Sequence, residues 1–468
     1  MILIVLWDGL RPDMISPERT PFLAECAAQG VFCRASHAAF PTATRINSAS
    51  LATGCYPGKH GIVDNELYVP ALNAQEPISC ADWRALQAMA DLEGGRLLTA
   101  STIGELLRDA GRRMVSGGSG SPGTTYLTNP TAINPIVNWA VSWPQATADE
   151  MARRYGGPLP STSTSTERNR YVLRAMSEYL IPTQRPDLAT IWLTEPDHTQ
   201  HYHGLCSPEA LATLRELDDD LCAFVGEAER LAGPEGLTCF LISDHGFDTI
   251  AERPDPEAEL VAAGFKVAPD STEIVSVSNS FYLNGPARGR LSEVVAFLGE
   301  RPWVGALMVR DDLLAECPGV LPQSAVFGNH SRSAEVMVSY RWWDAPNAYG
   351  VPGSVACPAP MAAIHGSASP YATNNTLVAW GTGVKEGLIS NVPCGIVDIA
   401  PTVLHLLGIE PPTGMDGRAL REILSGGPAP DSLPIVRTTI GATCGSRRQT
   451  AYYSAVEGHR YLDRITIE

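Results

Sequence analysis

The chain has 468 residues, of which 44% are hydrophobic and 18% charged, and its formal net charge at pH 7 is −17. This composition is typical of a soluble globular protein, and the length allows a large buried core. The negative balance argues against a nucleic-acid polymer as partner, since non-specific binding to one needs a basic surface. A small phosphate-bearing substrate stays possible, because bound metal ions can invert the local field.

The first seven residues, MILIVLW, are followed at once by Asp8. This segment has no basic region, long apolar run or cleavage site, so we expect no signal peptide. No apolar run in the sequence approaches the ~18 residues that a membrane-spanning helix needs. The eleven cysteines include no C-x-x-C pair and are expected to be reduced and mostly buried. These features predict a cytoplasmic protein without a membrane span, and they leave its oligomeric state open.

Short apolar runs and helical patterns alternate along most of the chain. In chain order, strands are expected at Ile2–Leu6, Ala189–Leu193, Cys239–Ile242 and Thr376–Trp380, and helices at Thr20–Gln29, Thr102–Ala110, Arg168–Tyr179, Pro208–Ala232 and Asp398–Leu407. Alternation of this kind is typical of βαβ units. We therefore predict an α/β fold with a mostly parallel central sheet sandwiched by helices.

The stretch from residue 251 to residue 361 has a different pattern. It holds short alternating runs, Glu273–Tyr282 and Ala334–Tyr340, separated by Pro, Gly and Asn. We interpret it as a small α+β cap inserted into the larger domain. The predicted organisation is a discontinuous core of residues 1–250 and 362–425, a cap of residues 251–361, and a C-terminal extension of residues 426–468 that packs on the core.

Five short stretches carry acidic, imidazole and hydroxyl side chains, most of them at the end of an apolar run. They are LIVLWDG, FPTATRIN, EPDHTQH, LISDHG and AIHGS, and they supply Asp8, Thr44, Asp197, His201, Asp244, His245 and His365. In an open α/β sheet, ligands bind outside the carboxyl ends of the strands. Each stretch alone is a weak signal, since an Asp-x-x-x-His pair is more often a solvated helix face. Their occurrence together predicts one site.

The residue types in this set indicate a metal site. Carboxylate, imidazole and hydroxyl groups suit zinc or another divalent first-row ion, and no cysteine is needed. Asp197 and His201 are four residues apart, so they lie on the same side of one helical turn. Asp244 and His245 are adjacent and reach one metal only if the backbone turns there, a turn that we expect Gly246 to permit.

In these stretches the chain resembles the alkaline phosphatase superfamily, and most closely its branch of nucleotide pyrophosphatase/phosphodiesterases. The motifs that carry the resemblance are FPTATRIN, LATGCYPGKHGIVDN, EPDHTQH, ISDHGF, the late IHG and GIVDIAPTVLHLLGIEPPTGMDGRAL, between Ile2 and about Leu420. The resemblance implies an alkaline phosphatase-like fold. It also implies a hydrolase that cleaves phosphodiester or pyrophosphate bonds in a small substrate with the help of two metal ions.

The resemblance further implies a role for each residue. Thr44 matches the nucleophile that would form a phospho-threonine intermediate, and Asn65 matches the asparagine that binds a non-bridging phosphoryl oxygen. One metal would be held by Asp8, Thr44, Asp244 and His245, and the other by Asp197, His201 and His365. Ligand type favours Zn²⁺, with Mn²⁺ or iron as alternatives. Such ions lower the pKa of a coordinated hydroxyl and clamp an in-line displacement.

Two departures from the family pattern bear on the substrate. Arg45 stands where the nucleotide-cleaving branch has an aromatic residue. It could bind a phosphate or a carboxylate of the substrate, or point to solvent. Monoesterases of the superfamily add a Lys-x-Arg pair, but none of the three lysines here has Arg two residues on, and the corresponding segment SGGSGSPGTTYLTNP has no basic residue. A site short of cations favours a singly charged diester.

Several alternatives stay open. A phosphomonoesterase or a phosphonate hydrolase could use the same site, and a non-catalytic metal-binding homologue or a phosphotransferase is a further possibility. Sulfatase chemistry is disfavoured, since the C-x-P-x-R context is absent around Thr44. In the cap, Tyr340, Trp342, Trp343 and Asn347 are expected either to pack the cap on the core or to line a substrate pocket.

Overall fold

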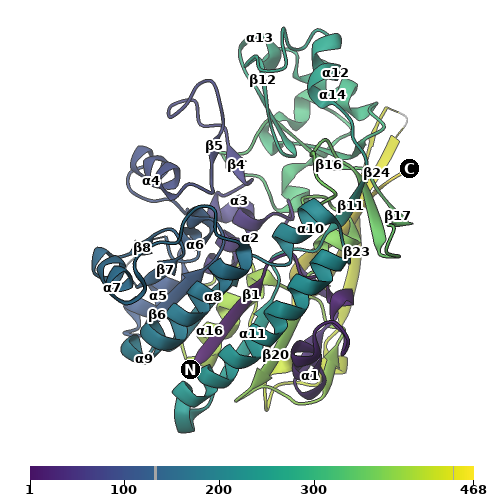
Figure 1. The fold of residues 1–468 in the computed structure, drawn as a ribbon. Helices are drawn as coiled ribbons and strands as arrows, with labels where there is room; N and C mark the ends of the chain where they lie inside the picture. Colours follow the sequence, from purple (N-terminus) through teal and green to yellow (C-terminus); the bar gives the residue numbers. More distant parts are fainter. Residues whose placement is uncertain (131–133, 446) are drawn as a thin grey trace.

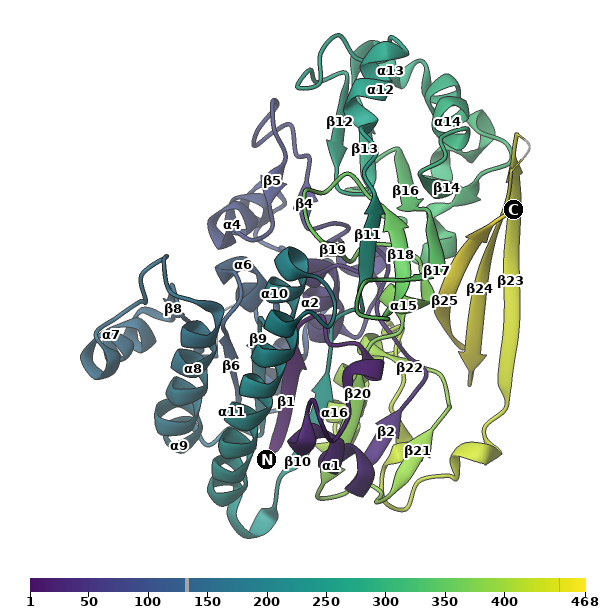
Figure 2. The ribbon, with the colours of Figure 1, turned by 45° about the vertical axis from the view of Figure 1, so that its right-hand side comes forward.

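The computed structural model describes residues 1–130, 134–445 and 447–468. Nine of the described strands form a central sheet with helices on both faces (Figure 1, Figure 2). The strand order is β21-β2-β20-β10-β1-β9-β6-β7-β8. These strands are β1 (Ile2–Trp7), β2 (Val31–Cys33), β6 (Met114–Gly118), β7 (Ile136–Asn138), β8 (Ser142–Trp143), β9 (Leu188–Leu193), β10 (Thr238–Ile242), β20 (Leu377–Gly381) and β21 (Leu388–Ser390).

Strand β1 lies inside this sheet, between β10 and β9, and runs parallel to both. Every residue of β1 is buried. Its sequence ILIVLW is apolar throughout, as expected for a strand that is covered on both faces. Parallel pairing continues from β9 through β6 to β7, and it also joins β2 to β21. The predicted mostly parallel sheet is confirmed, with β20 and β8 pairing antiparallel to their neighbours.

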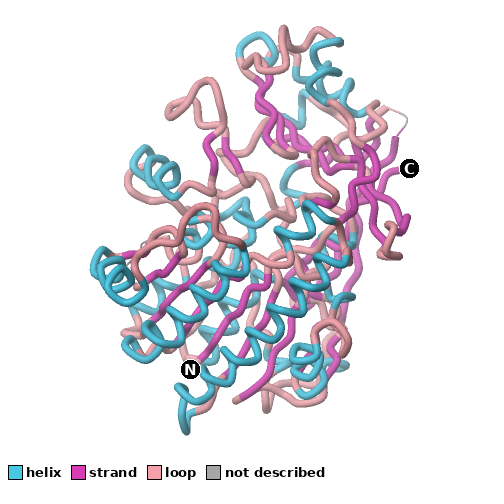
Figure 3. Tube along the Cα trace, in the orientation of Figure 1, coloured by secondary structure: helices cyan, strands magenta, loops and turns pink. Residues whose placement is uncertain are grey.

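Alternate residues of β1 enter separate hydrophobic clusters on the two faces of the sheet. Ile4 and Leu6 belong to one cluster, and Leu3 and Val5 belong to the other. The predicted sandwich of helices around the sheet is therefore confirmed, and Figure 3 shows the helices around the strands. Helices α2 (Thr44–Thr53), α4 (Trp83–Leu92), α5 (Ile103–Asp109) and α16 (Ile399–Leu406) cover the first face, and α1 (Pro21–Gln29), α7 (Gln145–Tyr155), α8 (Ser165–Ala175) and α11 (Pro208–Ala232) cover the second.

The helix predicted at Arg168–Tyr179 differs most from the observed one. Helix α8 begins earlier, at Ser165, because Thr164 and Glu167 form a capping box in which each side chain accepts the backbone N–H of the other residue. Its C-terminal end continues as a single π-helical turn, Met176–Leu180. This capping box therefore decides where the helix starts, rather than the apolar periodicity from which the start was predicted.

The inserted segment builds a sheet and a core of its own. Its described strands are β12 (Ile274–Val277), β13 (Ser280–Leu283), β14 (Val304–Val309), β15 (Leu321–Pro322) and β16 (Val336–Tyr340), in the order β12-β13-β16-β14-β15, with helices α12 (Pro256–Ala262), α13 (Gly285–Arg288) and α14 (Leu291–Gly299). A separate hydrophobic cluster includes Leu260, Phe281, Val294 and Val338. The run predicted at Glu273–Tyr282 is thus a β-hairpin that turns at Ser278, whose φ is 48°.

A small sheet joins the insertion to the core. It consists of β17 (Trp342–Pro346), β18 (Pro352–Ala356), β11 (Asp248–Glu252) and β19 (Ala363–Ile364). Strand β11 leaves the core directly after β10, and β19 pairs antiparallel with it on the way back. The two chain crossings between core and insertion therefore lie side by side. The division into core, cap and extension at the stated boundaries stays a prediction.

The C-terminal extension forms an antiparallel sheet of β23 (Ile435–Cys444), β24 (Arg447–Val456) and β25 (His459–Ile467) (Figure 2). It contacts the core where Tyr461 Oη donates to Asp398 Oδ2 at 2.8 Å. It also packs on the insertion, because the Gln449 side chain bonds the backbone N–H and C=O of Leu307 at 2.8 and 3.1 Å. The extension thus holds core and insertion together.

The shorter elements are α3 (Pro57–His60), α6 (Pro122–Leu127), α9 (Ile181–Gln184), α10 (Asp197–His203), α15 (Pro370–Thr373), β3 (Ser36–His37), β4 (Glu66–Leu67), β5 (Ile78–Ser79) and β22 (Cys394–Gly395). Within the described ranges, no helix has both the length and the apolar character needed to cross a membrane. Of the ten cysteines whose side chains are described, nine are buried and Cys222 is exposed. The expectation of mostly buried cysteines is confirmed.

Candidate metal centre and active site

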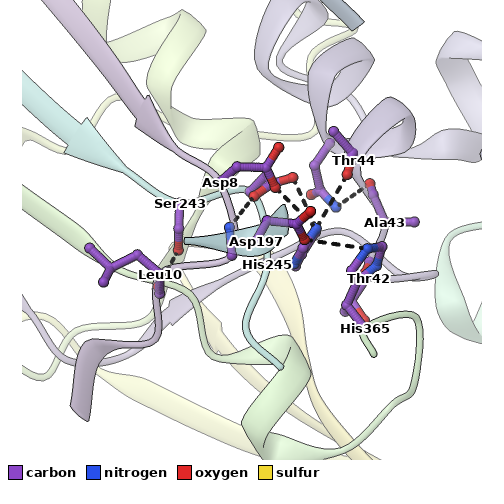
Figure 4. Close-up of polar contacts among 12 residues, drawn as sticks. Asp8, Leu10, Thr42, Ala43, Thr44, Asp197, Ser243, His245 and His365 are labelled. Atoms are coloured by element: carbon purple, nitrogen blue, oxygen red, sulfur yellow. Dashed lines mark hydrogen bonds and ion pairs between the residues drawn. The ribbon is translucent and has the colours of Figure 1, made fainter. Parts of the chain in front are cut away.

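The predicted site residues converge at one edge of the central sheet (Figure 4). Asp8 follows β1, Asp197 opens α10 after β9, and Asp244 follows β10. Because β1, β9 and β10 are parallel neighbours, their carboxyl ends meet at the same edge. Backbone bonds fix the junction: the Asp8 N–H donates to Leu193 O at 2.9 Å, and the Gly9 N–H donates to Asp244 Oδ1 at 3.1 Å.

The first group of possible metal ligands is Asp8, Asp244 and His245, whose ligand atoms all lie within 4.8 Å of one another. His245 Nε2 is 3.1 Å from Asp244 Oδ2 and 3.6 Å from Asp8 Oδ1. Thr44 is the first residue of α2, and its Oγ1 lies 3.4 Å from the same His245 nitrogen. All four side chains are buried. The structure thus brings together the four residues that the resemblance assigns to one metal.

The second group is Asp197, His245 and His365, again with ligand atoms within 4.8 Å of one another. Asp197 Oδ1 lies 3.3 Å from His201 Nε2 and 3.7 Å from His365 Nε2. The ring of His245 stacks on that of His365 with 3.7 Å between centroids. The three residues assigned to the other metal are therefore close to one another, and His245 belongs by distance to both groups. This shared position was not predicted, because it depends on how the separate segments pack.

Each of the three histidines is oriented by a backbone carbonyl. The Nδ1 atoms of His201, His245 and His365 lie 2.9, 3.0 and 2.9 Å from the carbonyl oxygens of Ala363, Gly246 and Thr42. A carbonyl only accepts, so Nδ1 carries the proton in all three rings. The lone pair of each neutral ring is then on Nε2, the nitrogen that faces the aspartates. This tautomer is the one that a metal ligand needs.

The aspartates present buried oxygen atoms toward the same centre. Asp8 Oδ1, Asp197 Oδ1 and Asp244 Oδ2 are buried, and none has a hydrogen-bond partner in the described structure. Burial, followed by the charges of Asp244 and Asp197, raises the pKa of Asp8 well above its usual value. Three carboxylates and three imidazoles with unused lone pairs fit divalent cations, which would satisfy these oxygens and remove the repulsion between them.

A second layer of hydrogen bonds holds the His365 loop. Thr42 Oγ1 donates to Ser367 O at 3.0 Å and accepts the Gly366 N–H at 2.9 Å. Asp248 accepts the hydroxyl groups of Ser367 and Ser369 at 2.5 and 2.7 Å. Burial raises the pKa of Asp248 to about 6. Sequence reasoning missed Thr42 and Asp248, although Asp248 stands only three residues after the metal-ligand candidate His245.

Asn65 is oriented by the first turn of α2. Its Oδ1 accepts the Arg45 backbone N–H at 3.0 Å, and a backbone N–H can only donate, so the amide oxygen is identified. Its Nδ2 is left to donate elsewhere. The preceding residue, Asp64, is buried and accepts the Asn65 N–H at 2.7 Å and the Ser280 hydroxyl at 3.1 Å. Asn65 is thus held between the nucleophile candidate and the insertion.

Two cavities adjoin the site. One, of about 360 Å³, is lined by Asn65 and His365 from the core and by Phe281 and Tyr340 from the insertion. The other, of about 570 Å³, is lined by Thr44 and Asp197, with Arg45 beside them. Both have the size of ordinary ligand sites. Arg45 therefore faces a cavity rather than open solvent.

The aromatic residues predicted in the cap divide between the two expected roles. Tyr340 lines the smaller cavity. Trp342 and Trp343 line neither cavity: Trp342 Nε1 donates to Ile465 O at 2.8 Å, and Trp343 packs on the core of the insertion. Asn347 Nδ2 donates to Leu205 O at 3.0 Å. Trp342 and Asn347 thus tie the insertion to the C-terminal sheet and to the core, while Trp343 packs inside the insertion.

Comparison with known proteins places this geometry in context. The family model described as type I phosphodiesterase / nucleotide pyrophosphatase matches residues 2–342. Venom phosphodiesterase 2 of Crotalus adamanteus is 26% identical over 245 residues, covering 52% of this chain and 25% of the relative. Ectonucleotide pyrophosphatase/phosphodiesterase family member 1 of Homo sapiens is 27% identical over 242 residues, covering 52% of this chain and 22% of the relative. The chain thus spans about a quarter of the length of these relatives.

Two solved structures share the fold. Wild-type alkaline phosphatase PafA matches with a TM-score of 0.69 and 19% identity, covering 91% of this chain and 98% of its own. Murine ectonucleotide pyrophosphatase/phosphodiesterase 5, as an inactive variant in complex with AMP, matches with a TM-score of 0.62 and 18% identity, covering 91% and 99%. The prediction of an alkaline phosphatase-like fold is confirmed.

Gly246 is required for a reason other than the predicted one. Its φ is outside the left-handed region, so the turn after His245 does not depend on glycine's freedom there. Instead, a Cβ at this position would lie 1.9 Å from Tyr371 O, and the Gly246 N–H donates to Ala372 O at 2.9 Å. The glycine allows the segment with Asp244 and His245 to approach the chain around α15.

We expect Gly246→Ala to lower the melting temperature and to weaken metal binding. The added methyl group must push the Asp244–His245 segment away from Tyr371, and such overpacking costs about 1–3 kcal/mol. The matched control is Gly226→Ala in α11, where a Cβ would meet nothing within 4 Å and where alanine stabilises a helix by about 0.5–1 kcal/mol. Thermal melting with and without added zinc measures both variants. Wild-type behaviour of Gly246→Ala would contradict the packing argument.

Proposed function

The chain belongs to the type I phosphodiesterase / nucleotide pyrophosphatase family, and from this membership and the site geometry we propose that it hydrolyses phosphodiester or pyrophosphate bonds of a small-molecule substrate, with Thr44 as the nucleophile. The observation that carries the proposal is the position of the Thr44 hydroxyl. It is buried at the start of α2, 3.4 Å from His245 Nε2, beside two groups of unsatisfied carboxylate and imidazole ligands.

The proposed cofactors are two divalent metal ions, with zinc favoured by the nitrogen and oxygen ligands and manganese or iron as alternatives. Asp8, Thr44, Asp244 and His245 would hold one ion, and Asp197, His201 and His365 would hold the other. The buried oxygen atoms without hydrogen bonds support this assignment. When bound, such ions lower the pKa of hydroxyl and water ligands and offset charge on the phosphoryl group.

In the proposed reaction, Thr44 Oγ1 attacks the phosphorus atom. Thr44 Oγ1 gives up its proton and forms a bond to phosphorus, the bond from phosphorus to the leaving oxygen breaks, and the leaving group departs with the bonding electron pair and takes up a proton from solvent. Attack by a water molecule on the phospho-threonine then breaks the Oγ1–phosphorus bond and restores the Thr44 hydroxyl. Asn65 is oriented by the Arg45 N–H to donate its Nδ2–H to a non-bridging oxygen, where charge builds up in the transition state.

The segment that lacks the Lys-x-Arg pair supports a diester substrate. Residues 116–130 contribute the end of β6 and helix α6 beside the larger cavity, and they contain no lysine or arginine. On this side of the cavity the segment offers no cation to pair with a doubly charged phosphate, which disfavours a monoester. One observation favours a monoesterase instead: Arg45 Nη2 donates to Ser121 Oγ at 3.4 Å, which places a guanidinium against this same segment.

We expect the zinc-loaded protein to show a higher kcat/KM for bis-p-nitrophenyl phosphate than for p-nitrophenyl phosphate. The preference should be about tenfold or more, which corresponds to about 1.4 kcal/mol of discrimination against the second negative charge. Release of p-nitrophenolate measures both reactions. A monoester preference that disappears in Arg45→Ala would contradict the diester assignment and support the monoesterase.

Thr44→Ala should lower kcat by about 10³-fold or more, because the nucleophile is removed while binding groups remain. Thr44→Ser should retain activity. The matched control is Thr53→Ala at the opposite end of α2, where Thr53 Oγ1 donates to Ala49 O at 2.7 Å. Acid quenching during turnover, followed by phosphopeptide mass spectrometry, should place the phosphoryl group on Thr44. Labelling of another residue would rule Thr44 out as the nucleophile.

A further inference from the structure

The larger cavity has a basic and aromatic wall that the proposed chemistry does not use. Beyond Thr44 and Asp197, its lining includes three arginines and two tryptophans: Arg45 of α2, Trp83 and Arg84 of α4, Trp139 directly after β7, and Arg168 of α8. The acidic residues that face the same cavity are Asp8 and Asp197, which belong to the candidate metal site, and Asp82. The Asp82 carboxylate accepts the Arg84 N–H at 2.9 Å as the N-cap of α4.

Arg168 is held in place on the face of Trp139. Its guanidinium carbon lies 3.8 Å from the centroid of the Trp139 ring, and its Nη2 donates to Ser161 O at 2.8 Å. Trp139 is itself fixed, because its Nε1 donates to Gly120 O at 2.9 Å. Stacking of this kind limits the freedom of a long side chain and orders the guanidinium before a ligand arrives.

Arg45 and Arg168 lack anionic partners. Neither takes part in an ion pair within 4.0 Å in the described part of the chain, and the Nε atoms of both are buried without a hydrogen bond. Burial lowers the pKa of Arg168. The neighbouring Arg170 on the same helix differs, since it pairs with Glu216 and Asp220 at 2.8 Å each.

Unpaired guanidinium groups are unusual in such an acidic chain. There are 51 acidic residues and only 34 lysines and arginines, so surface carboxylates are plentiful as partners. Partly burying a guanidinium without a partner costs free energy. Two such groups on the wall of one cavity indicate a ligand that brings the negative charge with it, and guanidinium geometry suits carboxylate and phosphate oxygens.

We propose that the wall formed by Arg168 and Trp139, together with Arg45, is a binding site for a second oxyanion of the substrate, a carboxylate or a phosphate separate from the phosphoryl group at Thr44. The proposal rests on the proposed function, because the cavity of about 570 Å³ joins this wall to Thr44 and Asp197 and one molecule would occupy both ends. The substrate class is then a phosphate ester or anhydride with a further acidic group, rather than a diester whose only charge is on the phosphoryl group.

The test is calorimetric titration of the zinc-loaded protein with phosphonates of increasing chain length that end in a carboxylate, in a second phosphonate, or in a methyl group. At one chain length or more, an acidic end should lower Kd by about 10-fold to 100-fold relative to the methyl end, as expected for charged hydrogen bonds. A gain confined to the carboxylates or to the bisphosphonates would identify which oxyanion is recognised.

Arg168→Gln should remove most of this gain, and Arg168→Lys should retain part of it, since lysine keeps the charge without the planar stacking group. The matched control is Arg170→Gln, which should leave the gain unchanged because Arg170 points to Glu216 and Asp220. Equal Kd values for acidic-ended and methyl-ended phosphonates at every chain length would overturn the proposal. The proposal would also fail if Arg168→Gln kept the full preference for acidic ends.

Turnover of bis-p-nitrophenyl phosphate is measured on the same wild-type sample. If the protein hydrolyses bis-p-nitrophenyl phosphate but binds acidic-ended and methyl-ended phosphonates with equal affinity, only this inference is refuted. If the protein binds the acidic-ended phosphonates more tightly but does not hydrolyse bis-p-nitrophenyl phosphate, only the proposed function is refuted.

Discussion

Three aspartates, Asp8, Asp197 and Asp244, meet at the carboxyl edge of the central sheet with buried oxygen atoms that accept no hydrogen bond in the described structure. Their proximity follows from the order of the sheet, in which β1 lies between β9 and β10 and parallel to both. Like charges brought together in this way repel, and burial strengthens the effect. Bound cations would remove this repulsion, and that role connects the aspartates to the chemistry proposed for their neighbours.

The histidines meet the same requirement from the other side. His201, His245 and His365 each bond a backbone carbonyl through Nδ1, which leaves Nε2 available toward the aspartates. Those carbonyls come from segments far apart in the chain, at Ala363, Gly246 and Thr42. The site is therefore ordered by tertiary contacts rather than by any single motif. The hydroxyl of Thr44 and the amide of Asn65 border this cluster. The cavity beside Arg45 reaches Thr44, and the smaller cavity reaches Asn65.

Much of this could be predicted from the sequence, because it depends on local pattern. The apolar run at Ile2–Leu6 indicated a strand, and an aspartate just after the end of such a strand indicated a site. Features that depend on packing could not be predicted. The place of His245 in both ligand groups, the contact of Gly246 with Tyr371, and the second layer around Asp248 arise only when separate segments fold together. The same holds for Arg168, whose position depends on stacking against Trp139, 29 residues earlier in the chain.

Two metal ions at this edge of the sheet are central to the proposed function. The most direct test is a crystal structure of the zinc-loaded protein with anomalous differences measured at the zinc edge. We expect two anomalous peaks, one beside Asp8 and Asp244 and one beside Asp197 and His365. A single peak, or none, in a crystal grown with excess zinc would rule out the two-metal site.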